Sequence, residues 1–391
     1  MEDVVIVSGV RTAIGTLGGA LSETPASDLG AAVIREAVAR AGLQPEQVDQ
    51  VILGCVGQVA EDGYIARHAS VKGGMPIGTP AYTVNRICGS GLEAINTAAR
   101  WLQTGDAEVV VAGGTENMSM MPFMLRKARF GYRLGHDVIE DGTVHLVTDP
   151  FEKIHMGITA ENLAEKYEVS REVQDEYSLR SQERARAAID AGYFKEQILP
   201  LEVKKGRDTI TFDTDEHPRA TSMELLGKLR PAFKPGGAVT AGNASGINDG
   251  AAALVVTTAS KARELGLKPR FRLVARAESG VDPRTMGEGP IPAIEKALAK
   301  AGLTVSDIDT IELNEAFAAV AAACSTALGL PMEKTNPNGG AIALGHPVGA
   351  SGAILTVKMM HELERTGGRY GLVSLCIGGG QGIASIFERL D

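Results

Sequence analysis

Hydrophobic and polar residues alternate along the chain in a pattern that predicts a mixed α/β protein. Residues 4–7 and 251–257 are short, almost purely apolar runs of the kind that form buried strands. Residues 33–41 and 293–301 place apolar side chains at helical spacing, and each segment reaches a glycine, an acidic turn and a short apolar strand. Helices that alternate with buried strands indicate a layered α/β fold.

The helix–turn–strand pattern occurs twice with similar sequence. Residues 33–54 are VIREAVARAGLQPEQVDQVILG, and residues 293–314 are AIEKALAKAGLTVSDIDTIELN. Later features recur in the same order: Cys88-Gly-Ser-Gly and His346-Pro-Val-Gly-Ala-Ser-Gly each precede a helical stretch, and residues 109–114 parallel residues 373–379. We interpret these matches as an internal duplication into two halves of similar topology.

The pattern changes between the two halves. Residues 115–150 show no clean period, residues 159–190 have helical spacing with a candidate N-cap at Ser170, and residues 200–245 carry proline, glycine and short β-like pieces. We therefore predict an N-terminal half at 1–268 that contains an inserted loop domain at about 119–247, and a C-terminal half at 269–391. Loops on a rigid scaffold commonly carry binding specificity.

Composition narrows the classes of function. The formal net charge of −9 argues against a nucleic-acid or membrane-surface partner, because such binding needs clustered Lys and Arg. No apolar run reaches the roughly 18 residues of a membrane span. The N-terminus lacks a basic leader, and the four cysteines show no metal-binding or disulfide spacing, so we expect a cytoplasmic protein with reduced thiols and no metal.

Cys88 is the first candidate for chemistry. It follows a strand-like stretch at 81–84 and precedes Gly-Ser-Gly and a helical stretch at 92–102. A cysteine here is either a buried small hydrophobic residue or a nucleophile. For a nucleophile, the positive end of the helix dipole is expected to favour the thiolate.

His346 and Cys376 both lie among glycines. Glycine density of this kind indicates a backbone that approaches something closely, although a lone histidine is as often structural. If the two halves face each other, Cys88 and His346 meet and form a pair that can activate a thiolate. Backbone N–H groups in the glycine run after Cys376 could bind an oxyanion, whereas its spacing does not fit a dinucleotide site.

Asn314 follows a short strand at 310–313 and precedes an Ala-rich helical stretch at 316–330. It is either an ordinary helix N-cap or an amide that positions water or a carbonyl group. Cys55 and Cys324 lack comparable neighbours, so we expect both to be core thiols.

Four motifs, in order, resemble those of the thiolase family, specifically its biosynthetic acetoacetyl-CoA branch. They are Asn85-Arg-Ile-Cys-Gly-Ser-Gly, Asn314-Glu-Ala-Phe, Gly345-His-Pro and Cys376-Ile-Gly-Gly-Gly. The resemblance covers essentially the whole chain. It implies duplicated βα halves that form a layered α/β/α/β/α core with an inserted loop domain. It also implies a reversible Claisen condensation of two acetyl-CoA to acetoacetyl-CoA and CoA by a ping-pong mechanism.

The resemblance implies a role for each catalytic position. Cys88 carries the acyl group, His346 takes the proton of Cys88, and Cys376 moves the second proton. Asn314 orients a water that forms one oxyanion hole with His346, and the backbone N–H groups of Cys88 and Gly378 form the other. A weakly acidic thioester α-proton can be removed only where the enolate is stabilised next to the base, which agrees with these roles.

The same resemblance implies the substrate-binding residues and the partners. The residues are His155, Met156, Arg219, Phe233, Ser245, Met286, Ala316 and Phe317. Acetyl-CoA, acetoacetyl-CoA and coenzyme A are substrates, no separate cofactor is needed, and the assembly is a homotetramer built as a dimer of dimers. Residues 118–134 resemble the loop that joins dimers in this family, although the stretch could instead cover the active site.

Three alternatives remain at this point. The chain could be a degradative 3-ketoacyl-CoA thiolase of broader chain length. It could be a ketoacyl synthase, although those enzymes pair their cysteine with two histidines or with histidine and asparagine. It could also be a thiolase-like protein that binds CoA without catalysis.

Overall fold

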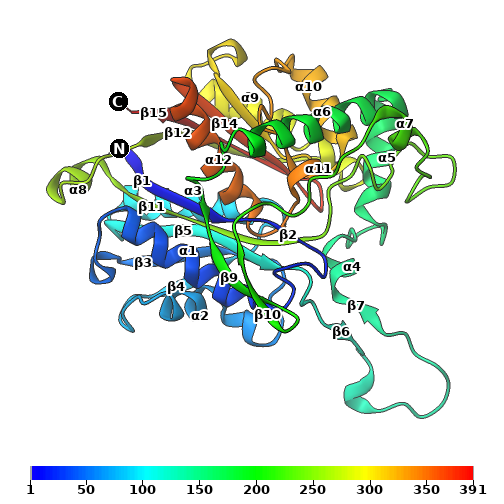
Figure 1. Cartoon of the computed structure of the whole chain (residues 1–391), viewed down its shortest axis with the longest axis horizontal. Coiled ribbons are helices and arrows are strands. Elements are labelled where there is room, and N and C mark those ends of the chain that lie inside the picture. Colours follow the sequence, from blue (N-terminus) through cyan, green and yellow to red (C-terminus); the bar gives the residue numbers. More distant parts are fainter. Residues whose placement is uncertain (1, 391) are drawn as a thin grey trace.

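The computed structural model describes residues 2–390 and is organised around a ladder of eleven strands (Figure 1). In order across the ladder, its main path contains β13 (Thr310–Leu313), β14 (Tyr370–Ile377), β15 (Gln381–Arg389), β12 (Phe271–Gly280), β1 (Val4–Thr12), β11 (Asn248–Thr258), β5 (Val109–Asn117), β3 (Gln50–Gly54) and β4 (Ala81–Val84). Two short strands, β2 (Gly15–Thr16) and β8 (Ile198–Leu199), pair with β11 and β1.

The strand order confirms the duplication. One half of the ladder runs β3-β5-β11-β1, and the other runs β13-β14-β15-β12. In each half the first pair is parallel and the next two are antiparallel. The halves are joined where β1 pairs with β12 over only two residue pairs, Val5 with Arg272 and Ile6 with Phe271.

Helices complete a five-layered α/β/α/β/α arrangement, which was the expected fold (Figure 1). The helices of the two halves are α1 (Ala26–Arg40), α2 (Ile65–Lys72), α3 (Ser90–Thr104), α8 (Ala259–Glu264), α9 (Pro290–Ala301), α10 (Ala318–Leu328), α11 (Ala341–Leu344) and α12 (Ser351–Thr366). The equivalent helices α1 and α9 cover the outer faces, and α3 and α12 lie between the two halves of the ladder.

Glycines allow α3 and α12 to touch backbone to backbone. A Cβ added at Gly352 of α12 would lie 2.3 Å from the Leu92 nitrogen of α3, and one added at Gly91 would lie 2.8 Å from the Ala353 nitrogen. Cβ atoms do not approach backbone atoms this closely, so larger residues at either position would push the helices apart. This contact brings the starts of the two helices together.

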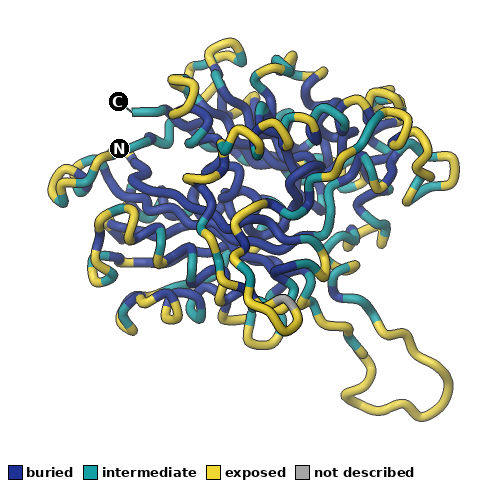
Figure 2. Tube along the Cα trace, in the orientation of Figure 1, coloured by how far each residue is buried: buried dark blue, intermediate teal, exposed yellow. Residues whose placement is uncertain are grey.

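The segment between β5 and β11 contains helices and two small hairpins. The helices are α4 (Gly142–Leu146), α5 (Met156–Lys166), α6 (Arg171–Asp190) and α7 (Met223–Gly227); the hairpin strands are β6 (Phe123–Met124), β7 (Glu140–Asp141), β9 (Leu201–Lys205) and β10 (Asp208–Phe212). Ser170 caps α6 by accepting a hydrogen bond from the Val173 nitrogen, as predicted. Figure 2 shows that residues 123–139 form a long exposed arm away from the buried core.

No helix within residues 2–390 is long and apolar enough to cross a membrane.

Candidate active site

Cys88 lies in the short turn between β4 and α3. Ile87, immediately before it, has a φ of +47°, which is unusual for a β-branched residue. The side chain of Asn85 accepts a hydrogen bond from the Ile87 nitrogen, and the Ser90 hydroxyl donates to the Ile87 carbonyl. The neighbouring side chains therefore hold a strained backbone in place, and such strain is common at functional sites.

Two backbone N–H groups, those of Cys88 and Gly378, hydrogen-bond the Cys88 sulfur and favour its thiolate. Burial has the larger effect and raises the pKa of the Cys88 thiol to about 11. The expected thiolate at the helix N-terminus is therefore wrong for the resting protein, because loss of water outweighs the helix dipole. Cys88 holds its proton until a base removes it.

His346 is buried and held at both its backbone and its ring. Its backbone nitrogen donates to Asn248 Oδ1 at 2.9 Å, and its Nδ1 lies 2.6 Å from the Ser351 hydroxyl. Because that hydroxyl donates its own proton to the Pro347 carbonyl, it accepts from Nδ1–H and leaves a lone pair on Nε2. Burial lowers the pKa of His346 to about 4, so the ring is a neutral base.

Asn314 directs its amide at this base. Its Nδ2 lies 3.4 Å from His346 Nε2, and its Oδ1 is buried without a hydrogen-bond partner among the described residues. Interpretation of Asn314 as a helix N-cap is wrong, because α10 begins only at Ala318, after Phe317. An unpaired buried amide oxygen beside a histidine is suited to hold a water molecule.

Cys376 lies near the end of β14, fully buried. Burial is the main reason that its pKa is raised well above the usual thiol value, and the nearby Cys88 adds to the effect. The chain then turns through Gly379 and Gly380, both with positive φ, before β15 begins. A strand, and not a helix, therefore follows the glycine run, and the turn brings the Gly378 nitrogen to Cys88.

A cavity of about 360 Å³ opens above these groups. The predicted site residues that line it are Cys88, His155, Met156, Arg219, Phe233, Ser245, Met286, Ala316, Phe317, His346 and Gly378. The other two predicted residues do not line the cavity but adjoin residues that do. Cys376 lies near Cys88, and Asn314 contacts His346. The structure thus brings residues from both halves and the inserted segment to one place.

Aromatic side chains form one wall of this cavity. The His155 ring stacks on Phe233 with centroids 4.6 Å apart, and Phe233 meets Phe317 edge to face at 6.1 Å. Phe233 can approach α5 this closely because residue 157 is glycine, where a Cβ would lie 2.2 Å from the ring. The Ser245 nitrogen donates to the Ala316 carbonyl, which fixes two segments of the wall to each other.

Arg219 belongs to the inserted segment and borders both the cavity and a neighbouring surface depression. Its backbone nitrogen donates to Gln182, and its guanidinium lies 3.3 Å from the ring of His217. Residues 195–235 contain eight Lys or Arg and seven Asp or Glu, so sequence alone indicates no basic patch there.

Sequence reasoning missed three residues that organise the site. Asn248 and Ser351 hold the backbone and ring of His346. Glu116 accepts hydrogen bonds from the nitrogens of Val56, Gly57 and Gly349, and so ties the loop after β3 to the turn that carries His346. Ser351 could have been found from its position five residues after His346; Asn248 and Glu116 gave no signal because their partners are distant in sequence.

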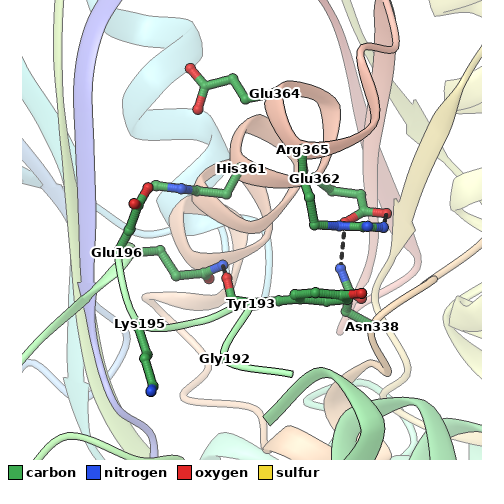
Figure 3. Close-up of a pocket in the computed structure, with 10 residues that line it drawn as sticks. Gly192, Tyr193, Lys195, Glu196, Asn338, His361, Glu362, Glu364 and Arg365 are labelled. Atoms are coloured by element: carbon green, nitrogen blue, oxygen red, sulfur yellow. Dashed lines mark hydrogen bonds and ion pairs between the residues drawn. The ribbon is translucent and has the colours of Figure 1, made fainter. Parts of the chain in front are cut away.

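A larger cavity, of about 500 Å³, lies elsewhere, between α12 and the turn after α6 (Figure 3). Half of its lining residues are charged, and Glu362 there is already paired with Arg365 and Asn338. Cys88, Cys376 and Gly378 are not among the residues that line it. Cavity size alone therefore does not identify the site; the convergence of Cys88, His346 and Gly378 does.

Comparison with known proteins agrees with the fold and the motifs. The thiolase N-terminal domain model matches residues 4–260, and the thiolase C-terminal domain model matches residues 267–389. The chain is 54% identical to the β-ketothiolase BktB of Cupriavidus necator over 392 residues, with 100% of both chains covered. It is 51% identical to the acetyl-CoA acetyltransferase of Escherichia coli K12 over 397 residues, again covering both chains fully.

Solved structures are equally similar. The acetyl-CoA acetyltransferase of Bacillus anthracis superposes with a TM-score of 0.98 at 48% identity, covering 100% of this chain and 99% of the other. Human mitochondrial 3-ketoacyl-CoA thiolase superposes with a TM-score of 0.97 at 46% identity, with the same coverage. The duplicated fold, the four motifs and these full-length matches together show that the chain belongs to the thiolase family.

Proposed function

We propose that the protein is an acetyl-CoA C-acetyltransferase. It condenses two molecules of acetyl-CoA to acetoacetyl-CoA and CoA, reversibly, by a ping-pong mechanism through an acyl-Cys88 intermediate. The observation that carries the proposal is the joint burial of a protonated thiol, a neutral imidazole and two backbone N–H donors at one cavity.

In the first half-reaction, His346 Nε2 takes the Cys88 proton as the sulfur attacks the thioester carbonyl. The hydrogen bonds from the Cys88 and Gly378 nitrogens are available to the oxyanion that forms there. CoA leaves with the proton of Cys376, which becomes a thiolate, while His346 keeps the proton of Cys88 and the acetyl group stays on Cys88. A resting thiol with a pKa of about 11 makes this proton transfer part of the attack itself.

In the second half-reaction, Cys376 removes a proton from the methyl carbon of another acetyl-CoA. A water held by Asn314, together with His346, stabilises the enolate oxygen. The enolate carbon attacks the acetyl group on Cys88, which forms the new C–C bond, breaks the bond between the Cys88 sulfur and the acyl carbon, and lets Cys88 recover its proton from His346. The low pKa of His346 favours return of its Nε2 proton to Cys88 at the end of this step.

Intact-mass measurement tests the nucleophile. Incubation with acetyl-CoA is expected to add one acetyl mass to the wild-type protein and none to Cys88→Ser. Cys324→Ser is the matched control, because Cys324 is a buried thiol, hydrogen-bonded to the Gly287 carbonyl, that does not line the active-site cavity. Acetylation of Cys88→Ser, or its loss in Cys324→Ser, would contradict the assignment.

We further propose that short 3-oxoacyl chains are preferred, because the bulky rings of His155, Phe233 and Phe317 pack together in the cavity wall and leave little room for a long chain. The alternative is a degradative 3-ketoacyl-CoA thiolase of broader chain length. Thiolysis rates for acetoacetyl-CoA, 2-methylacetoacetyl-CoA and longer 3-oxoacyl-CoAs distinguish the two. Rates that rise with chain length would favour the alternative.

The assembly that we propose is a cytoplasmic homotetramer. Its support is the exposed arm at 123–139, where Phe130 and Leu134 are 92% and 99% exposed. Exposed apolar side chains gathered on one segment mark protein contacts. The four free thiols suit a reducing compartment. Light scattering is expected to give four times the 40.9 kDa chain mass, and a dimer mass would remove the tetramer.

A further inference from the structure

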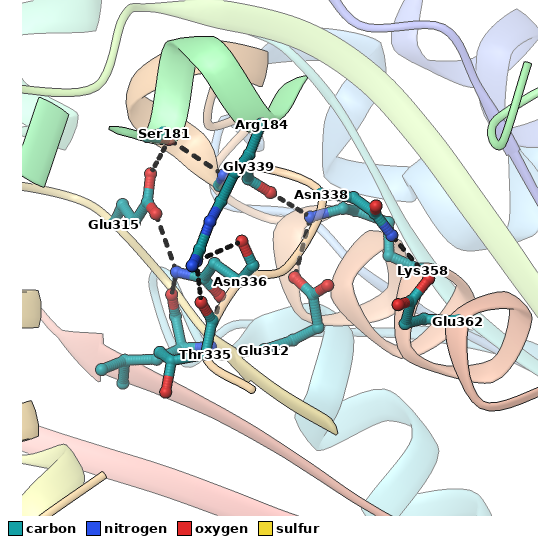
Figure 4. Close-up of polar contacts among 12 residues, drawn as sticks. Ser181, Arg184, Glu312, Glu315, Thr335, Asn336, Asn338, Gly339, Lys358 and Glu362 are labelled. Atoms are coloured by element: carbon teal, nitrogen blue, oxygen red, sulfur yellow. Dashed lines mark hydrogen bonds and ion pairs between the residues drawn. The ribbon is translucent and has the colours of Figure 1, made fainter. Parts of the chain in front are cut away.

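A network of buried polar side chains includes residues of α6, the segment after β13 and α12 (Figure 4). At its centre is Glu315, the residue next to Asn314 in the chain. The Glu315 carboxylate accepts hydrogen bonds from the Ser181 hydroxyl at 2.6 Å, from Asn336 Nδ2 at 2.8 Å and from the Ile342 nitrogen at 3.2 Å. The Tyr177 hydroxyl also hydrogen-bonds to it.

Asn336 holds the other side of Asn314. Its amide accepts from the Leu313 nitrogen at 2.9 Å and donates to the Leu313 carbonyl at 2.8 Å, so it pairs with both backbone groups of that residue. Asn336 has a φ of +47°, which aims its side chain at β13. Leu313 and Glu315, the two neighbours of Asn314, are therefore both fixed.

The donors to Glu315 come from two parts of the chain. Ser181 belongs to α6 of the inserted segment, whereas Asn336 and Ile342 belong to the C-terminal half. Residue 340 must be glycine, because a Cβ there would lie 2.3 Å from the Glu315 carboxylate. A buried carboxylate with four donors is costly to form and rigid once formed, since each donor limits its rotation.

We propose that Glu315, held by Ser181 and Asn336, is a positioning residue that aims the Asn314 amide at the water that stabilises the enolate oxygen. The inference rests on the proposed function and adds that acyl transfer and C–C bond formation depend on different sets of positioning residues. The hydrogen bonds to Cys88 Sγ come from the Cys88 and Gly378 nitrogens, and no hydrogen bond of Glu315 reaches either residue. His346 contacts Asn314 through Nε2, but its backbone and ring are held by Asn248 and Ser351, which Glu315 does not contact. Glu315 therefore serves C–C bond formation and not acyl transfer.

Two rates separate these steps. Exchange of labelled CoA into acetyl-CoA needs only acyl transfer to and from Cys88, whereas thiolysis of acetoacetyl-CoA also needs the C–C step. Glu315→Gln keeps the shape but turns an amide N–H₂ toward groups that donate. We expect about 10- to 100-fold slower thiolysis, because a displaced catalytic group costs up to about 100-fold, with the exchange rate within about twofold of wild type.

Glu362→Gln is the matched control. Glu362 is a buried carboxylate of the same network, paired with Asn338 and Arg365 (Figure 4). It does not line the active-site cavity that contains Cys88. Both rates should stay near those of wild type. Equal loss of exchange and thiolysis in Glu315→Gln, or loss of neither, would overturn the inference. If the wild-type protein performs no exchange, the proposed function fails instead.

Ser181→Ala keeps the test decisive if Glu315→Gln does not fold. It removes one donor and leaves the carboxylate with Asn336, Ile342 and Tyr177. Thiolysis should then slow by about 3- to 10-fold, as expected for loss of one hydrogen bond to a charged group, with exchange unchanged. A Ser181→Ala protein with both rates altered alike would equally refute the role of Glu315.

Discussion

Replacement of Gly352 by alanine tests how the two halves build the active site. The added Cβ would lie 2.3 Å from the Leu92 nitrogen and 2.7 Å from its Cβ. Ordinary contacts begin near 3.4 Å, so α12 must retreat from α3 by about 1 Å. Because α12 begins at Ser351, which holds the His346 ring, the retreat carries the base away from Cys88.

Stability and activity are expected to respond very differently. Overpacking of this kind costs about 1–3 kcal/mol. The entropy of unfolding is roughly 2.1 cal/mol/K per residue, or about 0.8 kcal/mol/K for 391 residues, so the melting temperature should fall by only about 1–4 °C. A displacement of about 1 Å between reacting groups, in contrast, costs on the order of 100-fold in rate.

The assay compares the thiolysis rate and the thermal melt of Gly352→Ala with those of Gly78→Ala. A Cβ at Gly78 meets nothing within 4 Å, so this control changes the same atoms without a clash. Thiolysis of Gly352→Ala should be about 100-fold slower and that of Gly78→Ala unchanged. If Gly352→Ala keeps its rate within about twofold, close contact of α3 and α12 does not set the distance between Cys88 and His346.

Three further predictions concern the groups around the nucleophile. Alkylation of Cys88 by iodoacetamide should rise about tenfold per pH unit from pH 6 to 9, because a pKa of about 11 leaves roughly one thiolate in 10⁴ at pH 7; a plateau in that range would show a resting ion pair. Asn248→Ala leaves the buried His346 nitrogen unpaired and should destabilise the protein by about 1–3 kcal/mol in urea unfolding, whereas unaltered stability would contradict the role of this contact. Ser351→Ala frees the His346 ring, so CoA exchange should slow about tenfold or more, and an unchanged rate would exclude Ser351 from orienting the base.

Much of the fold could be predicted because the duplication repeats a local pattern. The matching segments 33–54 and 293–314 each contain an outer helix and a parallel strand, and the structure places α1 with β3 and α9 with β13 in equivalent positions. Periodicity could not predict how β1 and β12 join the two sheets, because pairing between distant strands leaves no local mark in the sequence.

The protonation state of the site residues could not be predicted from the sequence. The helix N-terminus next to Cys88 was visible in the sequence, but the depth of burial was not, and burial decides the pKa. Asn314 was similarly ambiguous, because a cap and an active-site amide look alike until the start of the helix at Ala318 is known. Glu315 was part of a recognised motif, but its hydrogen bonds gave no signal, since its partners lie 21 to 138 positions away.

The narrow junction between β1 and β12 also affects the order of folding. Cys88 belongs to one copy of the duplicated unit and His346 to the other, and only two residue pairs of the ladder connect the copies. Each copy has its own sheet and helices, so secondary structure can form in both before they dock. During refolding, recovery of circular dichroism should therefore precede recovery of turnover, and enzymatic activity becomes a reporter of the docking step alone.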